Sequence, residues 1–511
     1  MESSEPKAYC LSAPVAHFCR TFAQLRSIGG HSGGRRLRFI VTGFGLVAAM
    51  NAACSTRSVL LATTVVGDET SAGTAGRAAQ AGATGQLVTG GAAGGATTPP
   101  LLIGSIDLRA SGPGIRLIVG DVNGDGRYDI VAMQPNKVPD GKTPHSVLAL
   151  TAFELDGTKL WQLGTPDATI TGSTSDIPAQ IYDIDGDGLN EVLTVMASKF
   201  LVIDGRTGTL KAQYDLPDPN AHDAIMIANL SGNVRPTDIV LKDRFTNLWA
   251  FDQGFHQLFK YTGGLSFYPW PFDWDKDGRD EIMAACQFLE SDGSLAWSCD
   301  TAAGSNQVDA VWAADLDPAA ANGTEVIIGA GDVMAFDHKG NLLFRADTEE
   351  AQNIVVADFR PDLPGLEIGG LDRIVRGVNG VDGIFMISST GKILVQEDRP
   401  EGSGWSTIVT MMRDWDGTKR DLIVAYGRAG SAPTLYDGRL NVVTSFPSER
   451  GQLIPVDLCG DSRQEIIAFS DTAAHVYATA PCDLSSHVTG KPASQPKYLY
   501  NWTRYWGGEY P

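Results

Sequence analysis

The sequence predicts an all-β protein, a β-propeller of eight four-stranded blades, with seven blades as the alternative count. Three observations predict it. Acidic loops of one pattern recur along the chain, an apolar β-rich run follows each loop, and most units begin roughly 42 to 46 residues apart, the usual length of a four-stranded blade. Helical periodicity is scarce. Because one such unit cannot bury its own faces, the units are expected to pack side by side into a closed ring.

Three of the acidic loops are complete and predict a metal. They occupy residues 121–129, 183–191 and 273–281, and each has oxygen-bearing side chains at alternate positions, a glycine at the sixth position and a closing acid at the ninth. Calcium takes about six to eight oxygen ligands, and this pattern supplies them around a sharp turn. The closing acid leads straight into an apolar strand, so a strand hairpin fits better than a helix-flanked calcium loop.

The predicted cofactor is therefore Ca²⁺, which would pin each hairpin and offset the repulsion between carboxylates. An acidic turn without metal is the alternative. A backbone carbonyl near residue 127, 189 or 279 would complete each set of ligands. The predicted side-chain ligands are Asp121, Asn123, Asp125 and Asp129; Asp183, Asp185, Asp187 and Glu191; and Asp273, Asp275, Asp277 and Glu281.

Five further units keep the closing acid and its strand but have incomplete loops. They lie at residues 229–238, 315–325, 358–367, 414–421 and 457–465. In the last of these, Cys459 stands where a hard oxygen ligand belongs. The loops around Asp315, Asp358 and Asp414 have altered lengths and are expected to close through backbone hydrogen bonds instead of metal.

Composition divides the chain into four segments. Residues 1–53 resemble an N-terminal extension and secretory signal, because basic residues 35–38 precede a short apolar run. Residues 54–100 form a Gly-, Ala- and Thr-rich flexible tether, residues 101–482 the propeller, and residues 483–511 an aromatic tail. Cys54 is placed like the lipidated cysteine of bacterial lipoproteins, with simple cleavage nearby as the alternative. The protein is therefore expected to be exported, either as an outer-membrane or cell-surface lipoprotein or in secreted form.

The net charge indicates which binding partners to expect, and the cysteines indicate whether disulfides form. The formal net charge of −20 argues against a nucleic-acid partner, and a membrane is expected only through a lipid anchor at Cys54. The expected state is a monomer. Cys286 and Cys299 fall on neighbouring predicted strands, and export favours oxidation, so we expect a disulfide between them, with two buried thiols as the alternative.

Candidate catalytic residues are sought where the inner strands of a propeller begin. The residues just before those strands are unusually polar: Arg116, Asp176, His222, Asp223, Tyr268, Gln307, Asp309, Asn353 and Gln452. His222 is the only histidine among them and is the best single general base; a solvated or core histidine is the alternative. Lys242 and Arg244 could hold a substrate carboxylate or form a salt bridge with Asp243 or Asp223.

The repeats resemble FG-GAP/VCBS calcium-binding propellers, and three stretches resemble the family 11 rhamnogalacturonan lyases, which are eight-bladed and calcium-rich. These stretches are 356–367, 273–281 with 289–297, and 239–244 leading to 248–252. The resemblance to the lyases implies an acidic polysaccharide or cell-surface glycan as partner and cleavage of a uronate-containing backbone by β-elimination.

The resemblance also implies roles for individual residues. His222 or Lys242 would be the base, Arg244 would hold the uronate carboxylate, and Asp223 or Asp309 would hold a calcium ion. The alternative function is a non-catalytic binding or adhesion propeller that presents its loops to a partner. The chain is thus expected to be either a polysaccharide lyase or a binding module.

Overall fold

The computed structural model describes residues 99–137, 145–170, 178–265, 267, 269–304, 307–320, 323–348, 350–372, 383–398, 407–427, 432–446, 449, 452–485 and 508–509. All of them belong to the second of two compact units, Ala92–Pro511. The predicted signal segment, Cys54, nearly all of the tether and most of the tail lie outside the described residues, as do Asp176 and Tyr268. Among the described residues, no helix is both long enough and apolar enough to span a bilayer.

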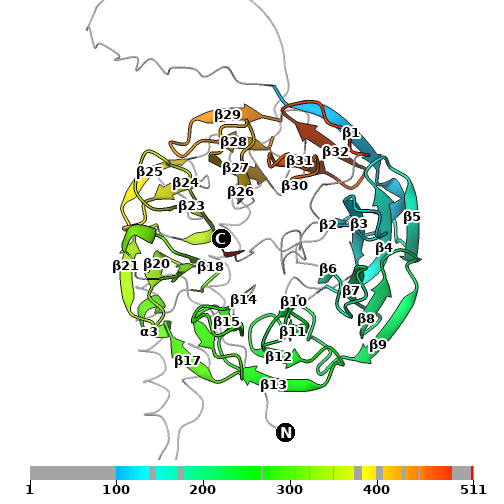
Figure 1. Cartoon of the computed structure of the whole chain (residues 1–511), viewed down its shortest axis with the longest axis horizontal. Helices are drawn as coiled ribbons and strands as arrows, with labels where there is room; N and C mark the ends of the chain where they lie inside the picture. The colour runs from blue at the N-terminus through cyan, green and yellow to red at the C-terminus, as the bar shows by residue number, and fades with distance from the viewer. Residues whose placement is uncertain are drawn as a thin grey trace, which may run out of the picture. The chain divides into compact units, whose positions relative to one another are not determined.

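The described residues confirm an all-β fold built from four-stranded antiparallel sheets, with very little helix (Figure 1). We number the four-stranded sets in chain order. Set 1 is β2 (Arg116–Gly120), β3 (Asp129–Pro135), β4 (Val147–Glu154) and β5 (Lys159–Gly164); set 2 is β6 (Ala179–Tyr182), β7 (Glu191–Met196), β8 (Lys199–Asp204) and β9 (Leu210–Asp215); set 3 is β10 (Ala224–Ala228), β11 (Asp238–Lys242), β12 (Asn247–Phe251) and β13 (Gln257–Thr262); set 4 is β14 (Trp270–Phe272), β15 (Glu281–Ala284), β16 (Gln287–Leu289) and β17 (Leu295–Ser298).

The second half of the chain continues in the same order. Set 5 is β18 (Ala310–Ala314), β19 (Glu325–Gly329), β20 (Val333–Phe336) and β21 (Leu342–Ala346); set 6 is β22 (Ala351–Ala357), β23 (Glu367–Asp372), β24 (Gly383–Ile387) and β25 (Ile393–Asp398); set 7 is β26 (Thr407–Arg413), β27 (Asp421–Gly427), β28 (Thr434–Tyr436) and β29 (Val442–Ser445); set 8 is β30 (Gln452–Val456), β31 (Glu465–Phe469), β32 (Ala473–Ala478) and β1 (Leu101–Asp107). The helical segments are η1 (Arg109–Ser111), α3 (Asp300–Ala303) and η2 (Pro318–Ala320). Sets 1 and 2 are joined into one sheet by a single pairing of β4 with β7.

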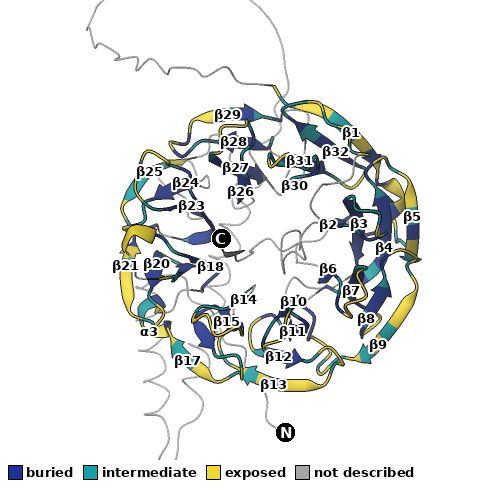
Figure 2. Ribbon diagram, in the orientation of Figure 1, coloured by how far each residue is buried: buried dark blue, intermediate teal, exposed yellow. Residues whose placement is uncertain are grey.

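Burial changes across each set, as Figure 2 shows. Every residue of β2, β10 and β11 is buried, whereas β9 and β13 alternate between exposed and half-buried residues. First strands of neighbouring sets lie in contact, as β10 does with β6 and β14, and β22 with β18 and β26. A strand that is covered on both faces buries all of its side chains, which is why the middle of each of these runs is apolar and the charged residues Arg116, Asp238 and Lys242 stand at strand ends.

The first and last sets share one core. Strand β1 precedes set 1 in the chain but pairs antiparallel with β32, and so supplies the fourth strand of set 8. Ile130 of set 1 and Ile467 of set 8 belong to the same buried apolar cluster. The N–H of Gly114 donates to the carboxylate of Asp471 at 2.9 Å. The beginning and the end of the described sheets are therefore packed against each other.

The described residues contain two disulfides. The predicted bond between Cys286 and Cys299 is confirmed, and it links the end of set 4 to β16. A second bond, which the sequence did not predict, joins Cys459 to Cys482. Of the aromatic tail, residues 483–485 and 508–509 are described, and the short β33 (Gly508–Glu509) pairs in parallel with β18.

Candidate functional site

Loop 121–129 connects β2 to β3 and shows the frame that the complete loops share. The carboxylate of Asp121 accepts hydrogen bonds from the N–H groups of Gly124 (2.7 Å) and Gly126 (2.9 Å). Both glycines have positive φ, 79° and 84°, which lets the chain turn around the carboxylate. The closing Asp129 accepts from the N–H of Val122 at 3.0 Å, and burial raises its pKa to about 7.

The middle ligands of this first loop are already partly engaged. Asn123 and Asp125 each accept a hydrogen bond at 2.9 Å from the backbone two residues further on. Arg127 also pairs with Asp125, and the resulting hydrogen bond and charge hold the pKa of Asp125 below its usual value, although burial opposes this. With an amide at its third position and a guanidinium at its rim, this loop is the least anionic of the three.

Loop 183–191 in set 2 repeats the frame. Asp183 accepts from Gly186 (2.6 Å) and Gly188 (3.1 Å), and the closing Glu191 accepts from Ile184 at 3.0 Å. Carboxylate oxygens of Asp183, Asp185 and Glu191 all lie within 4.8 Å of one another. Three of the four predicted ligands of this loop are thus brought together around one point.

A lysine that the sequence did not identify reaches into this loop. Lys211, on β9, places its Nζ 2.5 Å from Asp185, 3.2 Å from Asp187 and 2.8 Å from Glu191. These contacts raise the pKa of Lys211 above its ordinary value, although its partial burial opposes the shift.

Loop 273–281 in set 4 gathers its carboxylates without a cation. Oxygens of Asp273, Asp275 and Glu281 lie within 4.8 Å of one another, and Oδ1 of Asp273 is buried with no hydrogen-bond partner. Burial, aided by repulsion from Asp275, raises the pKa of Glu281 to about 8. Asp277 accepts from the backbone of Arg279 at 2.8 Å.

The arginine in this loop does not neutralise it. The guanidinium of Arg279 donates instead to the carbonyl of Leu230 in set 3, at 2.9 Å. Over the described ranges, no Lys or Arg forms an ion pair with the four predicted ligands of this loop, Asp273, Asp275, Asp277 and Glu281. A cluster of carboxylates with one orphaned buried oxygen is the chemistry that a hard divalent cation would satisfy.

The incomplete loop 457–465 keeps the frame but replaces a ligand. Asp457 accepts from the N–H groups of Gly460 (2.6 Å) and Ser462 (3.1 Å), and Glu465 accepts from Leu458 at 2.7 Å. Cys459 forms the disulfide to Cys482. Hydrogen bonds from backbone N–H groups to the two acids close this loop, and a covalent bond adds to them.

The catalytic candidates Lys242 and Arg244 converge on Asp223. Lys242 Nζ lies 2.9 Å from Asp223 Oδ2, and Arg244 donates to Asp223 Oδ1 at 2.7 and 2.9 Å. Nζ of Lys242 also donates to the carbonyls of Asp243 and Arg244, both at 2.8 Å. Of the two predicted alternatives for these cations, the salt bridge to Asp223 is the one observed.

Burial decides what this cluster can do. The side chains of Lys242 and Asp223 are each 1% exposed and that of Arg244 is 10% exposed. Burial alone would raise the pKa of Asp223, but the charges of Lys242 and Arg244 lower it. Because all three ammonium donors of Lys242 are used, its assignment as the base is not supported. Asp223, held by two cations, is likewise poorly suited to hold calcium.

His222 lies directly before this cluster and differs from it. The residue is 7% exposed, and its Nδ1 has no hydrogen-bond partner. Burial lowers its pKa, so the neutral imidazole is favoured. Of the three catalytic candidates, His222 therefore keeps a nitrogen that could accept a proton. Asp309, the other implied calcium holder, is buried directly before β18.

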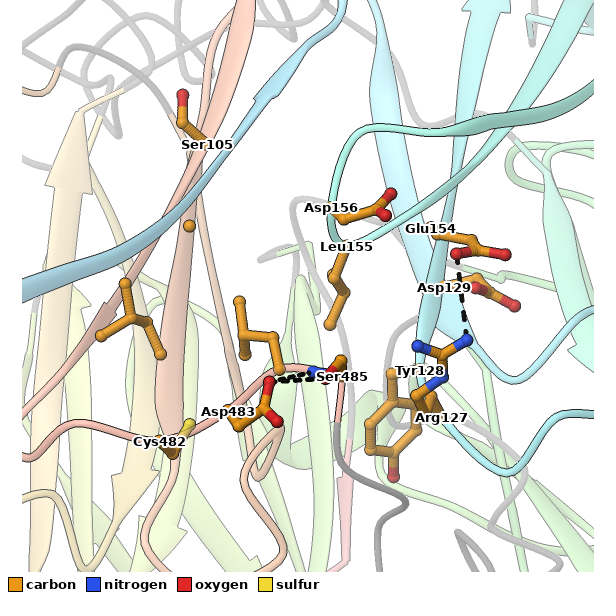
Figure 3. A pocket seen from close by; sticks show the side chains of 13 residues that line it. Ser105, Arg127, Tyr128, Asp129, Glu154, Leu155, Asp156, Cys482, Asp483 and Ser485 are labelled. Atoms are coloured by element: carbon orange, nitrogen blue, oxygen red, sulfur yellow. Dashed lines mark hydrogen bonds and ion pairs between the residues drawn. The ribbon is translucent and has the colours of Figure 1, made fainter.

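A pocket that the sequence did not predict lies where β1, loop 121–129 and the segment after β32 meet. Its volume is about 340 Å³. In Figure 3, Cys482, Asp483 and Ser485 lie on one side, and Arg127, Asp129 and Glu154 on the other. Its lining is acidic, with Arg127 as the only basic side chain. The pocket depends on contacts between the two ends of the described sheets, which no local motif reveals.

Comparison with known proteins agrees with the resemblance to lyases. The family described as rhamnogalacturonan lyase family 11, C-terminal domain, matches residues 115–214, which cover sets 1 and 2. The rhamnogalacturonan endolyase YesW of Bacillus subtilis (strain 168) is 24% identical over 310 residues, covering 54% of this chain and 46% of the endolyase. The rhamnogalacturonan exolyase YesX of the same organism is 23% identical over 454 residues, covering 71% of this chain and 70% of the exolyase. The chain thus spans about half the length of the first relative.

Solved structures show similarity of fold. The exotype rhamnogalacturonan lyase YesX has a TM-score of 0.54 at 21% identity, over 74% of this chain and 76% of that one. The V. cholerae biofilm matrix protein Bap1 has a TM-score of 0.51 at 13% identity, over 75% of this chain and 89% of that one. Since a lyase and a matrix protein both share the fold, the fold alone does not select the function.

Proposed function

We propose that this chain is an exported calcium-binding β-propeller that cleaves uronate-containing, rhamnogalacturonan-like polysaccharides by β-elimination. The observation that carries the proposal is the match of residues 115–214 to the family 11 lyases, together with two curated relatives that are both rhamnogalacturonan lyases. The same stretch contains two of the three complete acidic loops.

The proposed architecture is a closed ring of eight blades, one for each four-stranded set. Four buried clusters support it, because each is shared by successive sets: sets 2 and 3, sets 3 to 5, sets 5 to 7, and finally sets 7 and 8 with sets 1 and 2. Completion of set 8 by β1 supports closure in the same way. A chain whose first strand closes its last blade resists opening at that seam.

Calcium is proposed at the complete loops, which makes this a propeller of the FG-GAP/VCBS type. Loops 183–191 and 273–281 offer the best fit because three carboxylates converge in each. When bound, calcium would neutralise carboxylates that otherwise repel one another, and it would help an acidic protein approach an acidic polymer.

In the proposed reaction, a base removes the C5 proton of a uronate and the glycosidic oxygen leaves across the new double bond. His222 is the residue best suited as base, because Nδ1 carries no partner and its lowered pKa keeps it neutral. The Lys242–Asp223–Arg244 cluster would position it by fixing the backbone at Asp223, whose N–H donates to the carbonyl of Lys242 at 2.8 Å. Lys242 and Arg244 are thus proposed as positioning residues.

Export is supported by the two disulfides, since such bonds form and persist in oxidising compartments. A surface lipoprotein anchored at Cys54, or a secreted form, would meet polysaccharide outside the cell. The proposed partner is accordingly an acidic glycan.

An elimination assay tests the proposal. The full chain is incubated with rhamnogalacturonan and with other polyuronates, with calcium or with a chelator, and the ultraviolet absorbance of the unsaturated uronide is followed. We expect calcium-dependent product on rhamnogalacturonan, and a His222→Ala variant about 100-fold slower or worse in kcat. His256→Ala is the matched control, because His256 is exposed and pairs only with Asp252 on its own turn. Absence of product on every polyuronate would remove the lyase proposal.

A non-catalytic binding propeller is the second candidate. It is favoured by the burial of both candidate cations and by the similar fold of a biofilm matrix protein. This candidate predicts retention of the intact protein on immobilised acidic glycan, with no release of unsaturated product.

A further inference from the structure

Lys211 occupies the position that a metal ion would take in loop 183–191. Its Nζ lies within 3.2 Å of oxygens from Asp185, Asp187 and Glu191, three of the four predicted ligands. An ammonium group has three donors, and these three carboxylates can accept all of them. A calcium ion needs ligand oxygens at about 2.3–2.6 Å, so the ammonium and the ion cannot share this point.

The equivalent position in sets 1 and 4 carries no charge. Lys211 stands three residues after the turn glycine Gly208; the residues three after Gly157 and Gly293 are Leu160 and Ala296. The lysine is therefore a feature of set 2 and not of the repeat.

The two best loops consequently differ in charge. Loops 183–191 and 273–281 each contribute four predicted acidic ligands, but in the first Lys211 already neutralises one charge. In the second, Oδ1 of Asp273 is buried without a partner. Calcium entering the first loop must displace a charge-assisted network, whereas calcium entering the second relieves carboxylate repulsion.

We propose that Lys211 is a built-in competitor for calcium, so that loop 273–281 fills first and loop 183–191 fills only when calcium is high enough to displace the ammonium. The inference rests on the proposed calcium binding. The protein would then have one loop that binds calcium with high affinity and one loop whose calcium affinity is reduced by Lys211. Without metal, Lys211 holds loop 183–191 in its folded conformation.

Calcium titration calorimetry on the full chain tests this directly. Lys211→Met keeps the length of the side chain but removes the charge, and we expect it to tighten one class of calcium site by about tenfold or more, because one charge-assisted bond is worth at least that factor. Lys199→Met is the matched control, because Lys199 on the adjacent β8 pairs with Asp215 outside the loop; it should change nothing. Adding Asp185→Asn to Lys211→Met should abolish the gain.

Loop 273–281 carries its own reporter. Trp274 lies within the loop, and its backbone N–H donates to Glu281 at 3.1 Å. The part of the tryptophan-excited terbium luminescence that a Trp274→Phe variant loses therefore reports on this loop. We expect its terbium midpoint to be the same in wild type and Lys211→Met. If terbium binds there while Lys211→Met leaves all calcium affinities unchanged, the role of Lys211 is overturned and the calcium proposal stands. If neither calorimetry nor luminescence detects binding, the calcium proposal itself fails.

Discussion

Asp223 is the residue on which the buried charges of set 3 depend. Two cations, Lys242 and Arg244, share its carboxylate, and all three side chains are almost fully removed from solvent. A buried ion cluster adds little when intact, but removal of one partner leaves charges uncompensated in a medium that solvates them poorly. The sequence pattern Lys-Asp-Arg at 242–244 suggested a substrate clamp, and the fold turns it into an internal support.

The first prediction concerns this carboxylate. Asp223→Asn should lower the free energy of unfolding by about 3–5 kcal/mol, because an amide cannot neutralise two buried cations. Urea unfolding followed by tryptophan fluorescence measures the change. Asp215→Asn is the control, since Asp215 is 87% exposed and should contribute about 0.5 kcal/mol or less. A loss below about 1 kcal/mol for Asp223→Asn would show that the cluster is not a support.

Single elements of this fold are stabilised in different ways although they share one hydrogen-bond frame. In loops 121–129, 183–191 and 457–465 the carboxylate of the first residue accepts hydrogen bonds from the backbone N–H groups of the fourth and sixth residues. The carboxylate of the closing residue accepts a hydrogen bond from the backbone N–H of the second residue. What fills the centre varies. Loop 183–191 has a lysine, loop 273–281 has an orphaned oxygen, and loop 457–465 has a disulfide.

The second prediction compares the two disulfides. Replacing Cys459 and Cys482 together by Ala should lower the free energy of unfolding by about 3 kcal/mol. Replacing Cys286 and Cys299 should have a slightly smaller effect, because that bond closes 13 residues instead of 23. Thermal unfolding of both double variants, with the oxidised wild type as reference, measures this. Unchanged stability in the first variant would mean that backbone hydrogen bonds alone hold loop 457–465.

The chain has more acidic than basic residues, and the fold buries several of the acids that close its loops. Burial raises the pKa of Asp129, Glu367 and Glu465 to about 7, and that of Glu281 to about 8. Each of these groups begins the second strand of its set, where it must accept backbone hydrogen bonds inside the fold. The shared geometry of the sets therefore makes their pH responses add.

The third prediction is a pH dependence. An acid whose pKa is higher in the folded protein than in the unfolded chain keeps its proton on folding, so stability falls as pH rises between the two values. In chelator, the free energy of unfolding should decrease from pH 5 to pH 8. The pKa of His222 is lowered in the folded protein, so this residue makes the free energy of unfolding rise with pH. It is a single group, whereas four acids contribute in the other direction.

Urea unfolding at several pH values in chelator measures this dependence. Glu465→Gln should remove up to about 3 kcal/mol of the fall while keeping an oxygen for the N–H of Leu458. Asp156→Gln, at an exposed turn, should leave the slope unchanged. Stability that rises from pH 5 to pH 8 would contradict the prediction.

Several features followed from sequence because they depend on neighbouring residues. The acidic loops, their closing acids and the strands after them are set within nine residues, and the Cys286–Cys299 bond joins adjacent strands of one hairpin. Turn hydrogen bonds and the alternation of buried and exposed side chains involve residues close together in the sequence. For that reason an all-β fold of four-stranded units could be predicted.

Other features depend on contacts between residues far apart in the chain. The pairing of β1 with β32, the bond between Cys459 and Cys482, the pocket beside loop 121–129, and the reach of Lys211 into its loop are of this kind. Conversely, the sequence left open whether Lys242 and Arg244 hold a substrate carboxylate or form a salt bridge, and the structure buries both around Asp223.

The amino-acid sequence by itself thus determined the strands, the acidic loops between them and the chemistry that those loops could support, because each of these is written in short stretches of chain. Only the tertiary structure decided which charges remain available. A carboxylate or an ammonium is free or engaged according to what packs against it, and for Asp223, Lys211 and Asp273 that neighbour, or its absence, is a product of how the sheets come together.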